Sequence, residues 1–250
     1  MGLRGTRRPG RFKRDSVRHD GPLLLVTDTS SAYLNVALQR GSSLLSAHST
    51  YQPLSHARAL LPAIDLLLAE QGFKLVDVDG FGICLGPGSF TGLRVSMASI
   101  KALAYGTDKP ALGIPAVAVL AASVGGDLPV GCLIDARKGE AYSALFSAPD
   151  GAGHRQPILP VEAGTPEGGL ARLMGGVNGP ITLVGSSCLS APEELFAHSR
   201  LLLAEARWHL PDICTLARLC MERFERGETT TVEHLEPIYV GQPPIHKHRG

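Results

Sequence analysis

The pattern of apolar and polar positions predicts a β-β-β-α-β-α order over the first half of the chain. Residues 23–27 form a continuous apolar run, residues 33–39 alternate, and residues 43–50 form a third strand-like run. Runs of this kind joined by short polar turns are typical of a strand meander. Leucine and isoleucine then recur at helical spacing up to Gly72, and Pro62 predicts a kink or a restart within this helix. A strand over 79–85 and a helix over 93–105 complete the unit.

The second half repeats this order less clearly. We expect strands over 130–136, 141–146, 158–161 and 181–184, a weak helix over 166–174 and an amphipathic helix over 211–226. Residues 137–140 predict a hairpin turn, and residues 148–180 are rich in glycine and proline. The repeat predicts an α/β fold of duplicated β-β-β-α-β-α lobes, at residues 22–115 and 116–242, with a cleft between them.

Composition changes this picture only at the ends of the chain. An apolar content of 44%, a charged content of 19% and a net charge of +1 are ordinary for a globular protein and favour no particular partner. Residues 1–21 carry seven of the lysines and arginines and no apolar period, which predicts a disordered basic arm. The arm could be solvated or could contact RNA phosphates. Residues 243–250 are expected to form a flexible tail.

The cysteines and the apolar runs indicate a compartment. Five scattered cysteines without a C-x-x-C pair fit a reducing cytosol and no structural zinc. No apolar run approaches the length of a membrane span. We therefore expect a cytoplasmic protein that does not enter a membrane.

A glycine-rich loop between the predicted strand 79–85 and the predicted helix 93–105 is the strongest local signal. Two interpretations stay open: a strand-to-helix turn, and an anion site at a helix start. The spacing matches neither a Walker A loop, nor GxGxxG, nor a GxSxG elbow. Thr91 is the expected N-cap. The residues that define the loop are Gly86, Gly88, Ser89, Thr91, Gly92 and Arg94.

Few other residues offer chemistry. Asp28 at a strand end could face a magnesium–phosphate or form an Asx turn. Asp135 and Glu140 flank the predicted hairpin together with Arg137. The two carboxylates could serve in acid–base chemistry, but charged hairpin tips are commonly just solvated. His56 is a single histidine at a helix start. With no nucleophile–base pair and no metal set, we expect a non-catalytic partner subunit. The alternative is an ATP-dependent phosphotransferase or ATPase that uses Asp28 and the glycine loop.

Four segments carry a resemblance to a known family: residues 27–30, 86–94, 134–142 and 232–239. Together they resemble the bacterial TsaB (YeaZ) family of tRNA threonylcarbamoyladenosine biosynthesis proteins. The resemblance implies the actin/hexokinase/Hsp70-like (ribonuclease H-like) fold. It also implies pairing with the catalytic paralogue TsaD, action with the ATPase TsaE, and modification of the adenosine beside the anticodon of ANN-decoding tRNAs.

The resemblance implies further expectations about ligands and partners. The catalytic paralogues carry His-x-x-x-His as metal ligands, whereas here Leu60 follows His56 at that spacing. This departure disfavours a metalloprotease. We expect no cofactor on this chain alone, with ATP and metal on partner subunits, contact with tRNA through the complex, and a homodimer of the free subunit.

The two helices of the first half are the expected partner surface. The first is more apolar around its circumference than packing on one sheet requires. The second carries small residues that allow a close approach of another helix. Ala63 and Leu66 are predicted to face outward. The expected interface residues are His56, Ala59, Ala63, Leu66, Ser96 and Ser99.

Overall fold

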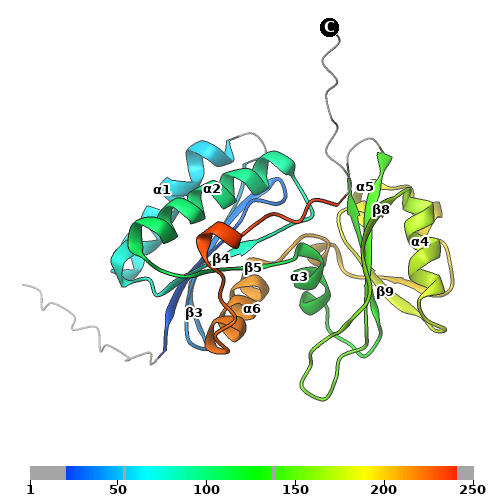
Figure 1. The fold of residues 1–250 in the computed structure, drawn as a ribbon. Helices are drawn as coiled ribbons and strands as arrows, with labels where there is room; N and C mark the ends of the chain where they lie inside the picture. Colours follow the sequence, from blue (N-terminus) through cyan, green and yellow to red (C-terminus); the bar gives the residue numbers. More distant parts are fainter. Residues whose placement is uncertain (1–20, 53–54, 137–138, 241–250) are drawn as a thin grey trace, which may run out of the picture.

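The computed structural model describes residues 21–52, 55–136 and 139–240 and contains two sheets that lie side by side (Figure 1). Residues 1–20, 241–250 and Arg137 lie outside this part, so the expectations about the tail, nearly all of the arm and that arginine stay predictions. The first sheet has the order β3-β2-β1-β4-β5. Its strands are β1 (Leu23–Asp28), β2 (Tyr33–Arg40), β3 (Ser43–Tyr51), β4 (Gly80–Cys84) and β5 (Ala111–Ile114).

The second sheet repeats the first. Its order is β10-β9-β6-β7-β8, so β6 to β10 take the places of β1 to β5 in the same succession. In both sheets the first three strands pair antiparallel and the last two pair parallel. The strands are β6 (Val130–Asp135), β7 (Ala141–Phe146), β8 (Pro157–Gly164), β9 (Ile181–Val184) and β10 (Leu201–Leu203).

Helices follow equivalent strands in the two halves. One helix follows the third strand, one the fourth and one the fifth, which confirms the predicted α/β fold of duplicated lobes. The helices are α1 (His56–Gln71), α2 (Phe90–Thr107), α3 (Ala116–Ser123), α4 (Pro166–Gly175), α5 (Ser187–Ser190) and α6 (Ile213–Glu225). Short 3-10 turns are η1 (Leu75–Asp77), η3 (Glu193–Phe196), η4 (Ala206–Trp208) and η5 (Val232–His234).

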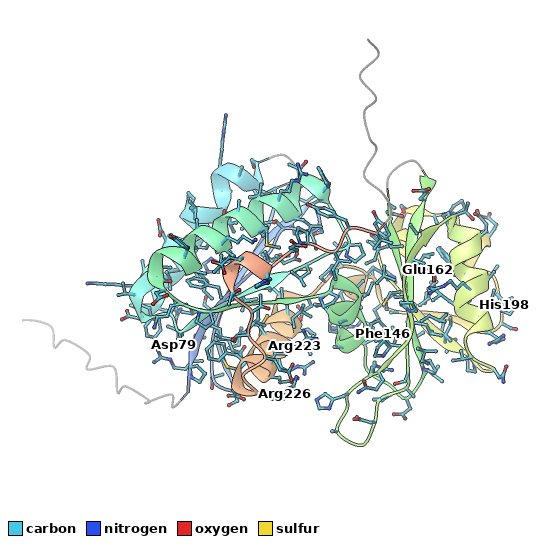
Figure 2. The ribbon with its side chains drawn as sticks, in the orientation of Figure 1. Asp79, Phe146, Glu162, His198, Arg223 and Arg226 are labelled. Atoms are coloured by element: carbon cyan, nitrogen blue, oxygen red, sulfur yellow. The ribbon has the colours of Figure 1, made fainter. Side chains whose placement is uncertain are left out.

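The last helix of each half crosses to the other half. Helix α6 packs on the first sheet, on the side opposite α1 and α2, and α3 contacts β6 of the second sheet (Figure 1). Arg223 of α6, labelled in Figure 2, donates from its guanidinium to the carbonyl of Gly113 in β5 at 3.3 Å. The predicted division into 22–115 and 116–242 stays a prediction: the sheets lie on either side of it, while α3 and α6 pack across it. The name first lobe is used for the first sheet with α1, α2 and α6, and the name second lobe for the second sheet with α4 and α5.

Helices α1 and α2 cover one face of the first sheet. Leu60, Ile64 and Leu67 of α1 are buried in a core cluster that also contains Ile100 of α2 and residues of β1, β2 and β4. Helix α1 runs through Pro62 without a break, so the predicted restart is wrong. Pro62 is exposed, and the apolar residues on the opposite side of the helix hold its turns on the sheet.

Two other details differ from the sequence-based expectations. Helix α2 begins at Phe90, and its N-cap is Ser89, whose hydroxyl accepts from the Gly92 amide, so Thr91 is not the cap. The sequence analysis also did not predict α3, α5, β5 or β10. No helix within the described ranges combines the length and the apolar character that a membrane span needs.

Candidate partner interface and interlobe cleft

The glycine-rich loop 85–92 packs its backbone directly on the turn that follows β1. The Ser89 amide donates to the Ser30 carbonyl at 2.7 Å. A Cβ atom on Gly88 would lie 2.4 Å from that same carbonyl oxygen, and one on Gly92 would lie 1.9 Å from the carbonyl oxygen of Thr29. Such distances are too short for any side chain, so only glycine permits this contact.

Side chains fasten the same junction. The Thr29 hydroxyl donates to the Gly92 carbonyl at 2.8 Å and lies 2.6 Å from the hydroxyl of Ser96. Gly86, with a φ of 83°, turns the chain out of β4. The amides of Ser89 and Gly92 are therefore bonded within the chain, to the turn after β1 and to the helix cap. This arrangement favours the turn interpretation over the anion-site interpretation.

Asp28 ends β1 and is held inside the protein. It is 1% exposed; one carboxylate oxygen accepts from the Ser30 amide at 2.8 Å, and the other lies 3.4 Å from the Asn35 side-chain nitrogen. Burial raises the pKa of Asp28 above its ordinary value. This geometry is the Asx turn that the sequence allowed, and no face of the carboxylate is open to a magnesium–phosphate.

A small cleft lies between the two lobes. Its volume is about 250 Å³, which is below the roughly 300–1,000 Å³ typical of ligand pockets. Burial lowers the pKa of His209, so its imidazole is neutral near pH 7 and adds no charge. None of the described lining residues is lysine or arginine; they are Ser30, Ser31, Ala32, Pro87, Gly88, Ser89, Leu120, Ile134, Asp135, Ser186, His209, Leu210 and Pro211.

The charged hairpin of the second lobe contributes one residue to this cleft. Asp135 accepts from the Ser190 hydroxyl at 2.7 Å, and its amide donates to the Ser186 hydroxyl at 2.9 Å. Glu140 is exposed and lies after the turn. Asp135 thus lies beside the cleft and bonds to both ends of α5. It is the one carboxylate among the described lining residues.

His56 stands at the start of α1 with its side chain inside the protein. It is 8% exposed, and its Nε2 atom has no hydrogen-bond partner within the described ranges. Leu60, one turn later, is fully buried in the core. Among the described residues, no group of three or more His, Cys, Asp or Glu side chains could hold a metal ion.

The outward surface of α1 and α2 differs from the one expected. Ser96 is 1% exposed and bonded to Thr29, so it lies inside the lobe; His56 is buried as well. Ala59 and Ala63 are partly buried and pack against the core cluster under α1, so Ala63 does not face outward as predicted. Leu66 is 54% exposed, in agreement with the prediction.

Two large apolar residues that the sequence analysis did not select face the solvent here. Leu61 of α1 is 47% exposed and Tyr105 of α2 is 79% exposed. The same two helices form a shallow groove of about 420 Å³, lined by Ala57, Phe90, Thr91, Arg94, Val95, Ala98 and Ser99. Leu61 lies one turn after Ala57, on the same side of α1. Apolar and small residues thus dominate a surface shared by two adjacent helices.

Comparison with known proteins adds information on the family. Residues 52–149 match the family described as TsaD, tRNA N6-adenosine threonylcarbamoyltransferase. The chain is 29% identical over 224 residues to the tRNA threonylcarbamoyladenosine biosynthesis protein TsaB of Escherichia coli, across 87% of this chain and 94% of that protein. It is 37% identical over 122 residues to TsaB of Haemophilus influenzae, across 48% of this chain and 51% of that protein.

A solved structure agrees with these matches along the whole fold. YeaZ from Pseudomonas aeruginosa superposes with a TM-score of 0.76 and 28% sequence identity, covering 88% of this chain and 100% of that chain. The similarity therefore includes both lobes and is not confined to the glycine-rich loop.

Proposed function

The chain belongs to the TsaB (YeaZ) family and takes part in tRNA threonylcarbamoyladenosine formation, and we propose that it does so as a non-catalytic subunit. In this proposal it pairs with a TsaD-like catalytic subunit in the cytosol. The complex places a threonylcarbamoyl group on the adenosine beside the anticodon of ANN-decoding tRNAs. The match of residues 52–149 to the TsaD family supports a paralogous pair, because paralogous subunits present related helices to one another.

The observation that carries this proposal is the apolar surface on α1 and α2. Leu61 and Tyr105 are large and exposed on these helices, and the small residues Ala98 and Ser99 line the groove that the two helices share. Exposed apolar residues that gather on one surface mark a protein contact more often than isolated ones do. Small residues on a helix allow a second helix to approach closely, so we assign a helix–helix contact with the partner to this surface.

The interior of the chain supports a non-catalytic role. Asp28 is used by its own turn, the glycine loop packs on backbone carbonyls, and the described lining of the cleft lacks a cation for a phosphate. ATP and metal chemistry would then belong to the partner subunits. A TsaE-like ATPase, tRNA bound through the complex, and a homodimer of the free subunit complete the proposed set of partners.

Isothermal titration tests this proposal against its alternative. The purified chain is titrated with the TsaD homologue encoded in the same genome, and separately with ATP and magnesium. We expect saturable binding to the TsaD homologue and no heat from ATP up to millimolar concentration. Micromolar ATP binding by the isolated chain, without binding to the TsaD homologue, would favour the ATP-dependent phosphotransferase instead.

A modification assay tests the role within the complex. The TsaD homologue, the TsaE homologue, a threonylcarbamoyl donor and tRNA are combined with and without this chain, and threonylcarbamoyladenosine is measured by mass spectrometry. We expect product only when the chain is present, and none from the chain in the absence of the TsaD homologue. Product formed by the chain alone would show that it is itself catalytic.

A further inference from the structure

The segment that follows α6 returns to the start of α2. After η5, Leu235 is 3% exposed within the core under α1 and α2, and the Ile238 amide donates to the Leu85 carbonyl at 2.8 Å. This segment is drawn in red in Figure 1 and passes close to α2. It ends with the ring of Tyr239 against that of Phe90, with centroids 5.6 Å apart and planes inclined by 46°. The segment thus adds an aromatic ring beside the first residue of α2.

Arg94 extends this contact into the groove between α1 and α2. Its guanidinium lies 3.9 Å from the centroid of the Phe90 ring, in the geometry of a cation–π contact. Arginine suits this position because its planar group stacks on a ring and still presents N–H donors at its edge. The stack Tyr239–Phe90–Arg94 therefore orients a positive charge that lines the groove.

Within residues 21–52, 55–136 and 139–240, no acidic side chain pairs with Arg94. Among the residues that the structure describes, no carboxylate forms an ion pair with its guanidinium, and no hydrogen bond uses its donors. The first turn of α2 contains no acidic residue, although the amides at a helix start carry partial positive charge that acidic residues usually offset. The start of α2 is therefore a locally positive point beside the apolar side chains Ala57, Val95 and Ala98.

We propose that Arg94, oriented by Phe90 and Tyr239, binds a carboxylate that an apolar helix of the partner subunit presents to the groove. This inference rests on the proposed function and adds the chemistry of the partner: a helix with apolar side chains and one Asp or Glu facing the start of α2. Charge complementarity of this kind fixes the register of two helices, which apolar contacts alone leave undefined. The segment 235–239 then acts in positioning, through the ring that it places against Phe90.

The test measures the affinity of the chain for the TsaD homologue of the same genome, by isothermal titration at low and at high salt. Arg94→Gln should weaken binding about 30-fold at low salt, because it leaves a partner carboxylate unpaired. Arg58→Gln is the matched control: it removes the same charge from an exposed residue of α1 that does not line the groove. We expect a change of less than about 3-fold for this control.

The salt dependence of the affinity distinguishes the loss of an ion pair from a general loss of contact. The affinity of the natural chain should fall as salt rises, whereas that of Arg94→Gln should fall much less, because screening acts on the charge that the variant lacks. Tyr239→Leu should weaken binding by roughly 2–10-fold through the loss of one ring contact, and Tyr239→Phe should bind normally. Circular dichroism and thermal melting check that every variant is folded.

The outcomes distinguish a failure of the proposed function from a failure of the inference about Arg94. If the natural chain does not bind the TsaD homologue at all, the proposed function is wrong. If the natural chain binds and folded Arg94→Gln binds equally well with the same salt dependence, only the present inference is overturned. Equal losses for Arg94→Gln and Arg58→Gln would also overturn it, because they would indicate a diffuse charge effect.

Discussion

The two lobes share one order of strands and helices, but they fasten their connections in different ways. In the first lobe, glycines bring two backbone segments into direct contact, as Gly92 does with the carbonyl of Thr29. The second lobe contains such a contact too, since a Cβ atom on Gly185 would lie 2.1 Å from the carbonyl oxygen of Leu133. In addition, arginine side chains of the second lobe bind carbonyl groups of its loops. The guanidinium of Arg155 donates to the carbonyls of Leu128, Ser147, Val124 and Gly126, and that of Arg200 donates to those of Gly179, Met174 and Val177.

The helices of the two halves also differ, in their length. Helices α1 and α2 have 16 and 18 residues, whereas their counterparts α4 and α5 in the second half have 10 and 4 residues. Two long helices that pack side by side offer an extended surface to a partner. Short helices joined by loops do not, and their loops need side chains to satisfy exposed carbonyls.

Replacing the glycine contact should have the largest effect on stability. In Gly92→Ala the new Cβ atom would meet the Thr29 carbonyl oxygen at 1.9 Å, so the loop must move away from β1, at a cost of roughly 3 kcal/mol. Gly106→Ala is the matched control in the same helix, because no atom lies within 4 Å of the position that its new methyl group would take. This control should gain up to about 1 kcal/mol. Urea denaturation gives both values, and a Gly92→Ala variant as stable as the control would contradict this account.

Removing an arginine anchor should have the next largest effect. Arg155→Gln loses hydrogen bonds from a charged group to several carbonyls, which should lower the free energy of unfolding by about 2 kcal/mol. Arg207→Gln removes an exposed arginine of the same lobe that pairs with Glu205, and its effect should stay within about 0.5 kcal/mol. Thermal melting of the two variants compares them. Similar losses would show that the Arg155 bonds do not stabilise the second lobe in the way proposed.

The smallest expected effect is a change in how the stability of the protein depends on pH. It arises from Asp28 at the end of β1. Burial raises the pKa of Asp28 above its ordinary value of 3.8. An acid that binds its proton more tightly in the folded state contributes stability at low pH and loses it as pH rises through the raised pKa. Asp28→Asn cannot ionise, so its stability relative to the natural chain should increase as pH rises from 4 toward 7. Urea denaturation over this range measures the difference, and the opposite slope would contradict the assigned pKa direction.

The sequence predicted the strands of both lobes best where the apolar pattern is strong. The continuous apolar run in β1 exists because the first sheet is buried on both faces near its centre. Strand β2 shows an alternation, although residues 34–39 are all buried. Helix α3 was missed because AVAVLAAS is apolar on every side, as suits a helix buried between the lobes, and therefore lacks a helical period. Strand β10 has three residues and gives no usable pattern.

The site was harder to predict than the fold, for physical reasons. Ser89 and Thr91 are equally good caps by residue type, and only the direction of the chain after Gly86 selects Ser89. The outward face of α1 depends on where α2 lies, which is why Ala63 was chosen and Leu61 overlooked. The contact between Tyr239 and Phe90 joins residues far apart in the sequence. Its one signal was that both residues lie in segments that resemble the family.

The central claim is tested most directly by two variants, each of which replaces one exposed leucine of one lobe. The measured quantity is the affinity of each variant for the TsaD homologue. Leu61 of α1 is 47% exposed and Leu189 of α5 is 54% exposed, so replacing either by glutamate should leave the fold intact. If α1 and α2 form the partner surface, Leu61→Glu buries a charge in the contact and should lower the affinity at least about 100-fold. Leu189→Glu should bind as the natural chain does. Normal binding by folded Leu61→Glu, or loss of binding by Leu189→Glu alone, would contradict the account.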